Sequence, residues 1–144
     1  MDSGRTFGEP LIVALSGHAD APRIVVDSQG RLHLVYGESP AGPFQEYRIR
    51  YARRDPGEHG FSAPRTIVAP QAGLNSVNFP DLAVGAADRL HVVWERFPDR
   101  RRLAQGLGFT KSHDGGQSFA EPEIVPGSDD TELGFNGGYQ GSLM

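Results

Sequence analysis

Two glutamates have the residue type and placement for acid–base chemistry. Glu38 and Glu95 each stand at the end of a short run of apolar and aromatic residues, a pattern typical of a buried strand. A hydrolase uses two carboxylates that face one substrate, one as an acid and the other as a base or nucleophile. The two glutamates, however, belong to neighbouring structural units and differ by one position when these units are aligned. The sequence therefore assigns no catalytic residue.

Two further groups have side chains that bind metals. His33 and His91 occupy the same position in two copies of one segment, which indicates packing or cross-strand hydrogen bonding rather than ligation. Asp129, Asp130 and Glu132 form an acidic loop of a composition that can bind calcium, although a solvated loop has the same composition. The chain has no cysteine, so a thiolate site is excluded. We predict no bound metal and no cofactor.

The composition fits one soluble domain of 144 residues. The net charge of −4 argues against nucleic acid as a partner, because the phosphate backbone favours clustered lysine and arginine. No apolar run approaches the ~20 residues that cross a membrane. Residues 1–5 have no apolar signal segment, so if the parent protein is exported, we expect its signal outside this chain. The compartment stays open.

The segments that must position these side chains repeat every 58 residues. Residues 31–36 (Arg-Leu-His-Leu-Val-Tyr) align with residues 89–94 (Arg-Leu-His-Val-Val-Trp) at this offset. Tyr51 likewise aligns with Phe109, and Phe61 with Phe119. A constant offset over more than forty residues indicates a repeat architecture, in which each unit is one supersecondary element.

Each unit contains four expected strands and no stretch with helical periodicity. Antiparallel units of four strands that recur at this spacing are the blades of a β-propeller. We therefore predict an all-β fold with one blade at 21–68 and another at 79–125. The expected strands lie at 23–26, 32–36, 47–53 and 65–68 in the first blade, and at 82–84, 90–94, 107–111 and 123–125 in the second.

Both ends of the chain align with parts of the same unit. Residues 2–13 align with residues 114–125, so we expect residues 1–13 to provide the outer strand of a preceding blade. Residues 126–144 are expected to form a loop and the start of a following blade. The sequence thus predicts about two and a half blades. Such a piece needs the remainder of a parent chain, or further copies of itself, to close a ring.

The turn at 112–122 has a distinct signature. Asp114 can accept hydrogen bonds from N–H groups of the turn, Gly115 and Gly116 permit positive φ, and Phe119 offers an aromatic anchor. This spacing resembles the Asp box, Ser-x-Asp-x-Gly-x-Thr-Trp, of sialidase-like propellers. The turn at 54–61 is degenerate because its aspartate comes one place early, which predicts another geometry. Three boxes with a structural role are expected: Asp2, Gly4 and Phe7; Asp55, Gly57 and Phe61; Asp114, Gly116 and Phe119.

Together with the pattern Pro-x-Ile-x-x-Asp-x-x-Gly-x-Leu-His-x-Val-aromatic at 22–36, these turns resemble the sialidase/neuraminidase superfamily, and more narrowly its BNR-repeat proteins. The resemblance covers nearly the whole chain. It implies a six-bladed propeller whose Asp boxes lie on the face opposite the ligand. The ligand face would then be built by five loops, at 14–21, 37–46, 69–79, 95–105 and 126–138.

A sialidase binds the carboxylate of its substrate with three arginines, and the resemblance places candidates for this role. Arg23 retains only the Arg-Ile part of the family's first arginine motif, and Asp81 takes its place in the next blade. Arg96 follows the strand that precedes the family's second arginine. With the two glutamates, the ligand-face candidates are Arg23, Glu38, Asp81, Glu95 and Arg96.

The resemblance implies three alternatives for function. The chain is expected to belong to a non-catalytic propeller that binds glycan or protein, or serves as a scaffold. Alternatively, it is part of a sialidase-type exo-glycoside hydrolase whose catalytic groups lie mostly outside this stretch. A third alternative is a blade module that assembles with copies of itself. Whether the parent protein is an enzyme stays open at this point.

Overall fold

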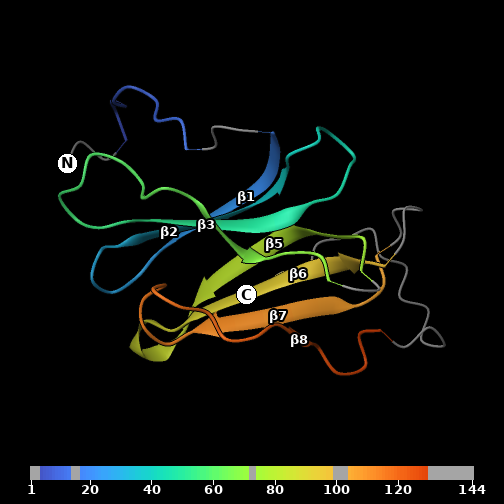
Figure 1. Ribbon diagram of the computed structural model, residues 1–144. Coiled ribbons are helices and arrows are strands. Elements are labelled where there is room, and N and C mark those ends of the chain that lie inside the picture. Colours follow the sequence, from blue (N-terminus) through green and yellow to red (C-terminus); the bar gives the residue numbers. More distant parts are fainter. Residues whose placement is uncertain (1–3, 14–16, 72–73, 99–103, 130–144) are drawn as a thin grey trace.

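A computed structural model describes residues 4–13, 17–71, 74–98 and 104–129. Within these residues, two antiparallel sheets of four strands lie one above the other (Figure 1). Within each sheet, every strand pairs with the next one along the chain, which confirms the predicted all-β fold. The first sheet contains β1 (His18–Val26), β2 (Leu32–Ser39), β3 (Arg48–Arg54) and β4 (Arg65–Val68), and the second contains β5 (Ser76–Val84), β6 (Leu90–Phe97), β7 (Leu107–Ser112) and β8 (Glu123–Ile124).

The offset of 58 residues relates the bounds of β5 and β6 to those of β1 and β2. It also relates two bulges, which follow Asp20 in β1 and Asn78 in β5. Both strands begin several residues earlier than the sequence predicts. A proline lies inside each bulge, Pro22 in β1 and Pro80 in β5. It has no N–H and interrupts the ladder, but pairing continues on the other side of the bulge.

The core lies between the two sheets, where β5 packs against β1, β2 and β3. Trp94 is 2% exposed and is among the largest buried side chains. Strand β2 and strand β6 are buried along most of their length, as their nearly continuous apolar sequences predict. The buried cluster consists of Val35, Ile49, Tyr51, Val68, Val77, Leu82, Leu90, Val92 and Trp94.

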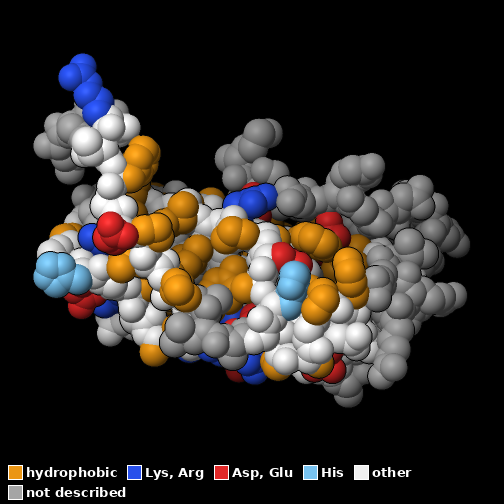
Figure 2. Space-filling model, turned by 90° about the horizontal axis from the view of Figure 1, so that it is seen from above, with side chains coloured by type: hydrophobic (Ala, Val, Ile, Leu, Met, Phe, Trp, Pro, Cys, Tyr) orange, Lys and Arg blue, Asp and Glu red, His pale blue; other side chains and the backbone are white. Residues whose placement is uncertain are grey.

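The outer face of the first sheet is apolar and exposed. Ile24 and Val26 in β1 are 56% and 60% exposed, whereas Leu82 and Val84, their equivalents in the repeat, pack in the core between the sheets. Figure 2 shows apolar side chains gathered over this face. The same repeat position is therefore covered by a neighbouring sheet in one unit and uncovered in the other.

Two further segments complete the described chain. Residues 86–88 form a short 3₁₀ turn, η1 (Ala86–Asp88). Among the described residues, no helix is long and apolar enough to cross a membrane. Residues 4–13 form no strand in this structure, and Phe7 is 90% exposed. The outer strand of a preceding blade, expected at 1–13, stays a prediction. Asp2 and the segment from 130 onward lie outside the described residues.

Candidate functional site

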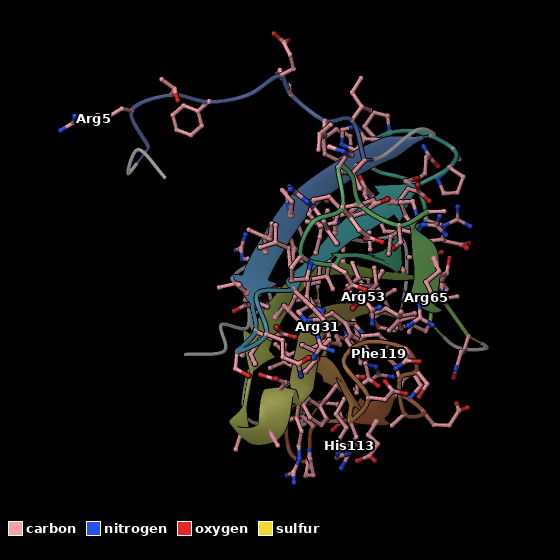
Figure 3. All side chains as sticks on the ribbon, turned by 90° about the vertical axis from the view of Figure 1, so that its left-hand side faces the viewer. Arg5, Arg31, Arg53, Arg65, His113 and Phe119 are labelled. Atoms are coloured by element: carbon pink, nitrogen blue, oxygen red, sulfur yellow. The ribbon has the colours of Figure 1, made fainter. Side chains whose placement is uncertain are left out.

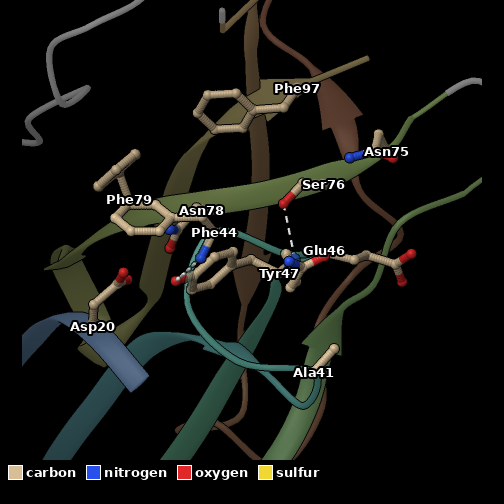
Figure 4. Close-up of a pocket in the computed structure, with 11 residues that line it drawn as sticks. Asp20, Ala41, Phe44, Glu46, Tyr47, Asn75, Ser76, Asn78, Phe79 and Phe97 are labelled. Atoms are coloured by element: carbon tan, nitrogen blue, oxygen red, sulfur yellow. Dashed lines mark hydrogen bonds between the residues drawn. The ribbon is translucent and has the colours of Figure 1, made fainter. Parts of the chain in front are cut away.

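A pocket of about 590 Å³ lies at the end of the sheets where the β2–β3 loop meets the start of β5 (Figure 4). By the register of the strands, this end is opposite the Asp114 turn, which connects β7 to β8. Four of the five loops that the sequence predicts for the ligand face contribute residues to this pocket. The lining residues are Asp20, Ala41, Phe44, Gln45, Glu46, Tyr47, Asn75, Ser76, Asn78, Phe79 and Phe97.

Tyr47 fixes the β2–β3 loop to the second sheet. Its backbone N–H donates a hydrogen bond to Ser76 Oγ at 2.9 Å, and its carbonyl accepts one from the N–H of Val77 at 3.2 Å. The Tyr47 hydroxyl accepts a bond from the N–H of Phe44 at 3.4 Å. These bonds hold the loop against β5, so this wall of the pocket is tied to both sheets.

Aromatic rings form much of the wall. Phe79 and Phe97 have ring centroids 6.2 Å apart with planes tilted by 59°, and Phe44 is 69% exposed. Phe44 and Phe79 both have positive φ, 62° and 52°, a backbone conformation that costs a bulky residue roughly 1–3 kcal/mol and is concentrated at ligand sites. The Tyr47 hydroxyl holds the backbone of Phe44, and Phe79 packs against Phe97.

Polar oxygens lie beside these rings. Asn78 is 5% exposed, and its Oδ1 is buried without a hydrogen bond from the described part of the chain. The same holds for Asp20 Oδ1, while Asp20 Oδ2 lies 3.7 Å from His18 Nε2. Gly37 leaves room here, because a Cβ at this position would overlap the Asn78 amide and lie 3.1 Å from Asp20 Oδ1. Buried acceptors of this kind call for a donor.

The structure brings two of the sequence-derived candidates together, and they bind each other. Arg23 Nε lies 3.5 Å from Asp81 Oδ1, and the same carboxylate oxygen accepts a hydrogen bond from the N–H of Leu82 at 2.9 Å. Arg23 and Asp81 occupy equivalent positions of the repeat. Because the first unit has arginine there and the second has aspartate, the two form an ion pair between the sheets. Neither residue lines the pocket.

The two glutamates have different surroundings and do not form a pair at the pocket. Glu38 is 1% exposed and accepts bonds from Arg48 Nε and Nη2 at 2.9 and 2.6 Å, with Arg50 Nε at 3.4 Å. Glu95 is 2% exposed, and its Oε1 has no hydrogen-bond donor in the described ranges. Burial raises the pKa of the Glu95 carboxyl.

Arg96, the fifth candidate, lies near the end of β6 and does not line the pocket, although its neighbour Phe97 does. Its backbone N–H donates to the carbonyl of Gly106 at 3.1 Å, and its carbonyl accepts from Gln105 at 2.7 Å. These bonds close the β6–β7 loop. The role of Arg96 as a ligand-binding residue stays a prediction.

The most informative pocket residues were not among the sequence candidates. No sequence motif marks Tyr47, Asn78 or Phe79. The predicted ligand-face loops at 37–46 and 69–79 only indicate the region in which these residues lie. One signal existed, since Phe79 departs from the repeat, in which its equivalent is Ala21. A large ring in place of a methyl group at a bulge is the kind of deviation that marks a site.

At the other end of the sheets, Asp114 organises the β7–β8 turn. Its Oδ1 accepts a bond from the Ser118 N–H at 2.9 Å and its Oδ2 one from the Ser118 hydroxyl at 2.5 Å. Ser112 Oγ donates to Oδ1 at 2.8 Å. The hydrogen bonds from Ser118 are the main cause that lowers the pKa of Asp114 below its usual range. This is the turn-closing chemistry predicted for Asp114, whereas assignment as an Asp box stays a prediction.

The Asp114 turn also joins the two sheets (Figure 3). Phe119 packs edge-on against Tyr51 with centroids 5.0 Å apart. Arg53 donates to the carbonyl of Gly115 at 3.1 Å, and Arg65 donates to that of Gly116. A side chain at Gly116 would overlap the Tyr51 hydroxyl. The turn is therefore fitted to strand β3 of the first sheet.

The turn at 54–61 has a different geometry, as the early position of its aspartate predicts. Asp55 Oδ2 accepts a bond from Arg53 Nη2 at 2.8 Å. The turn is closed instead by Glu58, whose N–H donates to the Asp55 carbonyl at 3.1 Å and whose carboxylate accepts from the Asp55 N–H at 3.0 Å. Gly57 has φ of +86°.

The two repeated histidines are packing residues. His33 stacks on Tyr51 and His91 on Phe109, with centroids 6.1 and 5.9 Å apart. His33 Nδ1 lies 2.8 Å from the Tyr51 hydroxyl, and its Nε2 lies 3.0 Å from Asp27. Burial raises the pKa of Tyr51 to about 12, so its hydroxyl stays protonated at neutral pH. This is the role that the repeat predicts for them.

Solved structures share this arrangement. The chain superposes on a Hadza microbial sialidase, Hz136, with a TM-score of 0.63 and 15% identity, over 74% of this chain and 26% of that one. It superposes on a protein of unknown function from Dyadobacter fermentans DSM 18053 with a TM-score of 0.59 and 17% identity, over 76% and 36% of the two chains. No protein-family model and no curated protein matches the chain.

The fold is therefore that of part of a sialidase-like propeller, and the two sheets correspond to blades. This confirms the fold that the sequence resemblance implies. The chain spans 26% and 36% of the two solved structures that it matches, so the number of blades in a whole protein stays a prediction. A likeness at this level of identity concerns the fold alone.

Proposed function

We propose that the chain is the binding part of a sialidase-like propeller and that its pocket holds a carbohydrate without hydrolysing it. The observation that carries this proposal is the combination, in one hollow, of aromatic rings and converging polar groups. Phe44, Phe79 and Phe97 supply the rings, and Ser76 and Asn78 supply polar atoms beside them.

A sugar ring has apolar C–H surfaces and a polar rim. Small-molecule sites are largely apolar pockets in which a few placed polar groups fix the orientation of the ligand. The rings at the pocket suit the C–H surface, and the amide and hydroxyl groups suit the hydroxyls. The volume of about 590 Å³ lies within the range of roughly 300–1,000 Å³ that ligand pockets have.

The surroundings of the carboxylates support binding rather than hydrolysis. Glu38 is engaged by two arginines, and Glu95 does not line the pocket. Among the described residues, the two carboxylates that do line it, Asp20 and Glu46, lie on opposite sides of it in Figure 4. Catalysis by paired carboxylates needs both groups directed at one bond.

The direct test is a glycan array probed with the 144-residue chain, followed by titration of the bound glycans. The substitution Phe79→Ala should weaken binding about tenfold, because a central aromatic contact commonly contributes more than 1 kcal/mol. Phe7→Ala is the matched control, since it makes the same change at a ring that is 90% exposed and outside the pocket. Binding to no glycan, or equal losses in both variants, would contradict the proposal.

The rival function is that of a sialidase-type hydrolase whose remaining catalytic groups lie in a longer protein. A fluorogenic sialoside incubated with a longer protein that contains this chain distinguishes the two, and we expect no release of fluorophore above buffer. Turnover by that protein that Arg96→Ala abolishes would overturn the non-catalytic proposal. It would also assign a substrate role to the arginine that the sequence resemblance singled out.

A further inference from the structure

The charged groups at the pocket have one sign. Asp20 and Glu46 are acidic, and none of the other described residues that line the pocket is lysine, arginine or histidine. Arg48 and Arg50 on the first sheet are directed at Glu38 instead. A ligand carboxylate is ordinarily bound by arginine, whose planar guanidinium matches its two oxygens. The described wall offers no such partner.

The polar atoms at the base of the pocket accept hydrogen bonds. Asn78 Oδ1 and Asp20 Oδ1 are buried and receive no donor from the described part of the chain. Asn78 Oδ1 occupies the position that a Cβ at Gly37 would take, and Asp20 Oδ1 lies beside that position. The Asp20 side chain as a whole is 34% exposed, so a ligand that brings N–H or O–H groups can donate to its carboxylate. A ligand carboxylate cannot do so, because it brings only acceptors.

We infer that the pocket selects neutral sugars and amino sugars and disfavours acidic sugars, including sialic acid. The inference rests on the proposed carbohydrate-binding function and specifies its ligand class. Hydroxyl or ammonium groups donate to the Asp20 carboxylate, while the rings of Phe79 and Phe97 cover the C–H surface. A carboxylate on the sugar would face Asp20 and Glu46, and none of the described lining residues supplies a cation to balance it.

The test compares sugars that share one ring and differ in charge. The methyl glycosides of glucose, glucosamine and glucuronic acid form one such series, those of galactose, galactosamine and galacturonic acid a second, and the methyl glycoside of sialic acid is added to both. Each is titrated into the 144-residue chain by calorimetry or NMR. We expect the acid to bind about tenfold more weakly than the neutral sugar of its series, and the amine at least as tightly, because one charge pair near a protein surface is enough for this ratio.

The outcomes separate this inference from the proposed function. Binding of an acidic sugar as tight as that of its neutral counterpart would overturn the inference and leave the carbohydrate-binding function standing. Binding of none of the sugars in either series, together with a blank glycan array, would overturn both. Tighter binding of sialic acid than of any other sugar would also overturn the inference.

A variant tests whether Asp20 causes the discrimination. Asp20→Asn should reduce the ratio between neutral and acidic sugars from about tenfold to about twofold and should remove any preference for the amine. Glu9→Gln makes the same change of charge at an exposed residue outside the pocket and should leave the ratios unchanged. Equal ratios in the wild type and in Asp20→Asn would contradict the assignment, and thermal unfolding of each variant verifies that it is folded.

Discussion

At the scale of single residues, the sharpest constraint is at Gly116. Its φ is +84°, and a Cβ would overlap the Tyr51 hydroxyl of the other sheet. Gly57 has nearly the same φ, +86°, but open space around it. Gly116 is therefore required both by its positive φ and by the close packing of the two sheets. Gly57 is required by its positive φ alone.

We expect Gly116→Ala to reduce the free energy of unfolding by about 2–4 kcal/mol, through left-handed strain and overlap with Tyr51. Gly57→Ala should cost only about 1–2 kcal/mol, from the strain alone. Urea denaturation of both variants measures the two values. Equal losses would show that the fit of Gly116 against Tyr51 contributes nothing to stability.

Asp114 makes the stability of the chain depend on pH. Because its pKa is lowered in the folded state, the ionised carboxylate stabilises the fold above the ordinary aspartate pKa of about 3.9, and this contribution is lost as the pH falls below it. Asp114→Asn should therefore flatten the decrease in unfolding free energy between about pH 5 and pH 2. Chemical denaturation across this range measures the slope, with Glu9→Gln as the control of equal charge.

At the scale of the strands, the two buried glutamates predict opposite effects of the same substitution. Glu95 has a raised pKa because of burial, so its ionised form opposes folding, and stability is lost as the pH rises from the unfolded pKa through the folded one. Glu95→Gln should therefore stabilise the chain at pH 7 and have little effect at pH 4. Thermal unfolding at both pH values measures this, and a loss of stability at pH 7 would contradict it.

Glu38→Gln should destabilise the chain, in contrast to the change at Glu95. The substitution leaves Arg48 and Arg50 without the carboxylate that they share. A broken buried ion pair can cost 3–5 kcal/mol, and we expect about 1–3 kcal/mol here because Arg48 is partly exposed. The comparison of the two glutamine variants in one unfolding assay distinguishes a paired buried charge from an unpaired one.

The strands were largely predictable, because their apolar runs repeat at a fixed offset. The second strands at 32–36 and 90–94 and the fourth at 65–68 lie inside β2, β6 and β4. The sequence missed the early parts of β1 and β5. Pro22 and Pro80 suggest a strand end when only local propensity is considered, and pairing across a bulge depends on the neighbouring strand.

The site was predictable only as a set of loops. Local sequence placed the ligand face at the β2–β3 loop and the segment before β5. It favoured five charged residues, however, and two of them, Arg23 and Asp81, prove to bind each other. Ion pairs between sheets depend on the packing of two units, which no single segment encodes. Asn78 has no motif, and its importance arises from burial and from the missing side chain at Gly37.

At the scale of the whole molecule, the exposed outer face of the first sheet predicts self-association. Ile24 and Val26 are more than half exposed, while the equivalent face of the second sheet is covered by the first. A second copy, or another blade of a longer protein, can cover the exposed face in the same manner. An apolar sheet face that stays uncovered favours association with other chains.

We expect the 144-residue chain to be larger than a monomer in light scattering behind a sizing column. Ile24→Lys together with Val26→Lys should shift it toward the monomer, because two charges on this face disfavour burial. Ile124→Lys is the control, at an exposed apolar residue of β8 in the second sheet. A wild-type monomer, or equal shifts in the double variant and in the control, would contradict the assignment of this face.

The pairing of consecutive strands within each sheet has a consequence for the order of folding. Hairpins between consecutive strands close short loops and form early, since contacts of small sequence separation are made fastest. The Asp114 turn, in contrast, meets Arg53 and Arg65 across 62 and 51 residues of chain. The first sheet contains all its own hairpins by Val68, well before the turn that docks on it exists. Folding on a ribosome would thus proceed one blade after another, with the docking of this turn as the late step that joins them.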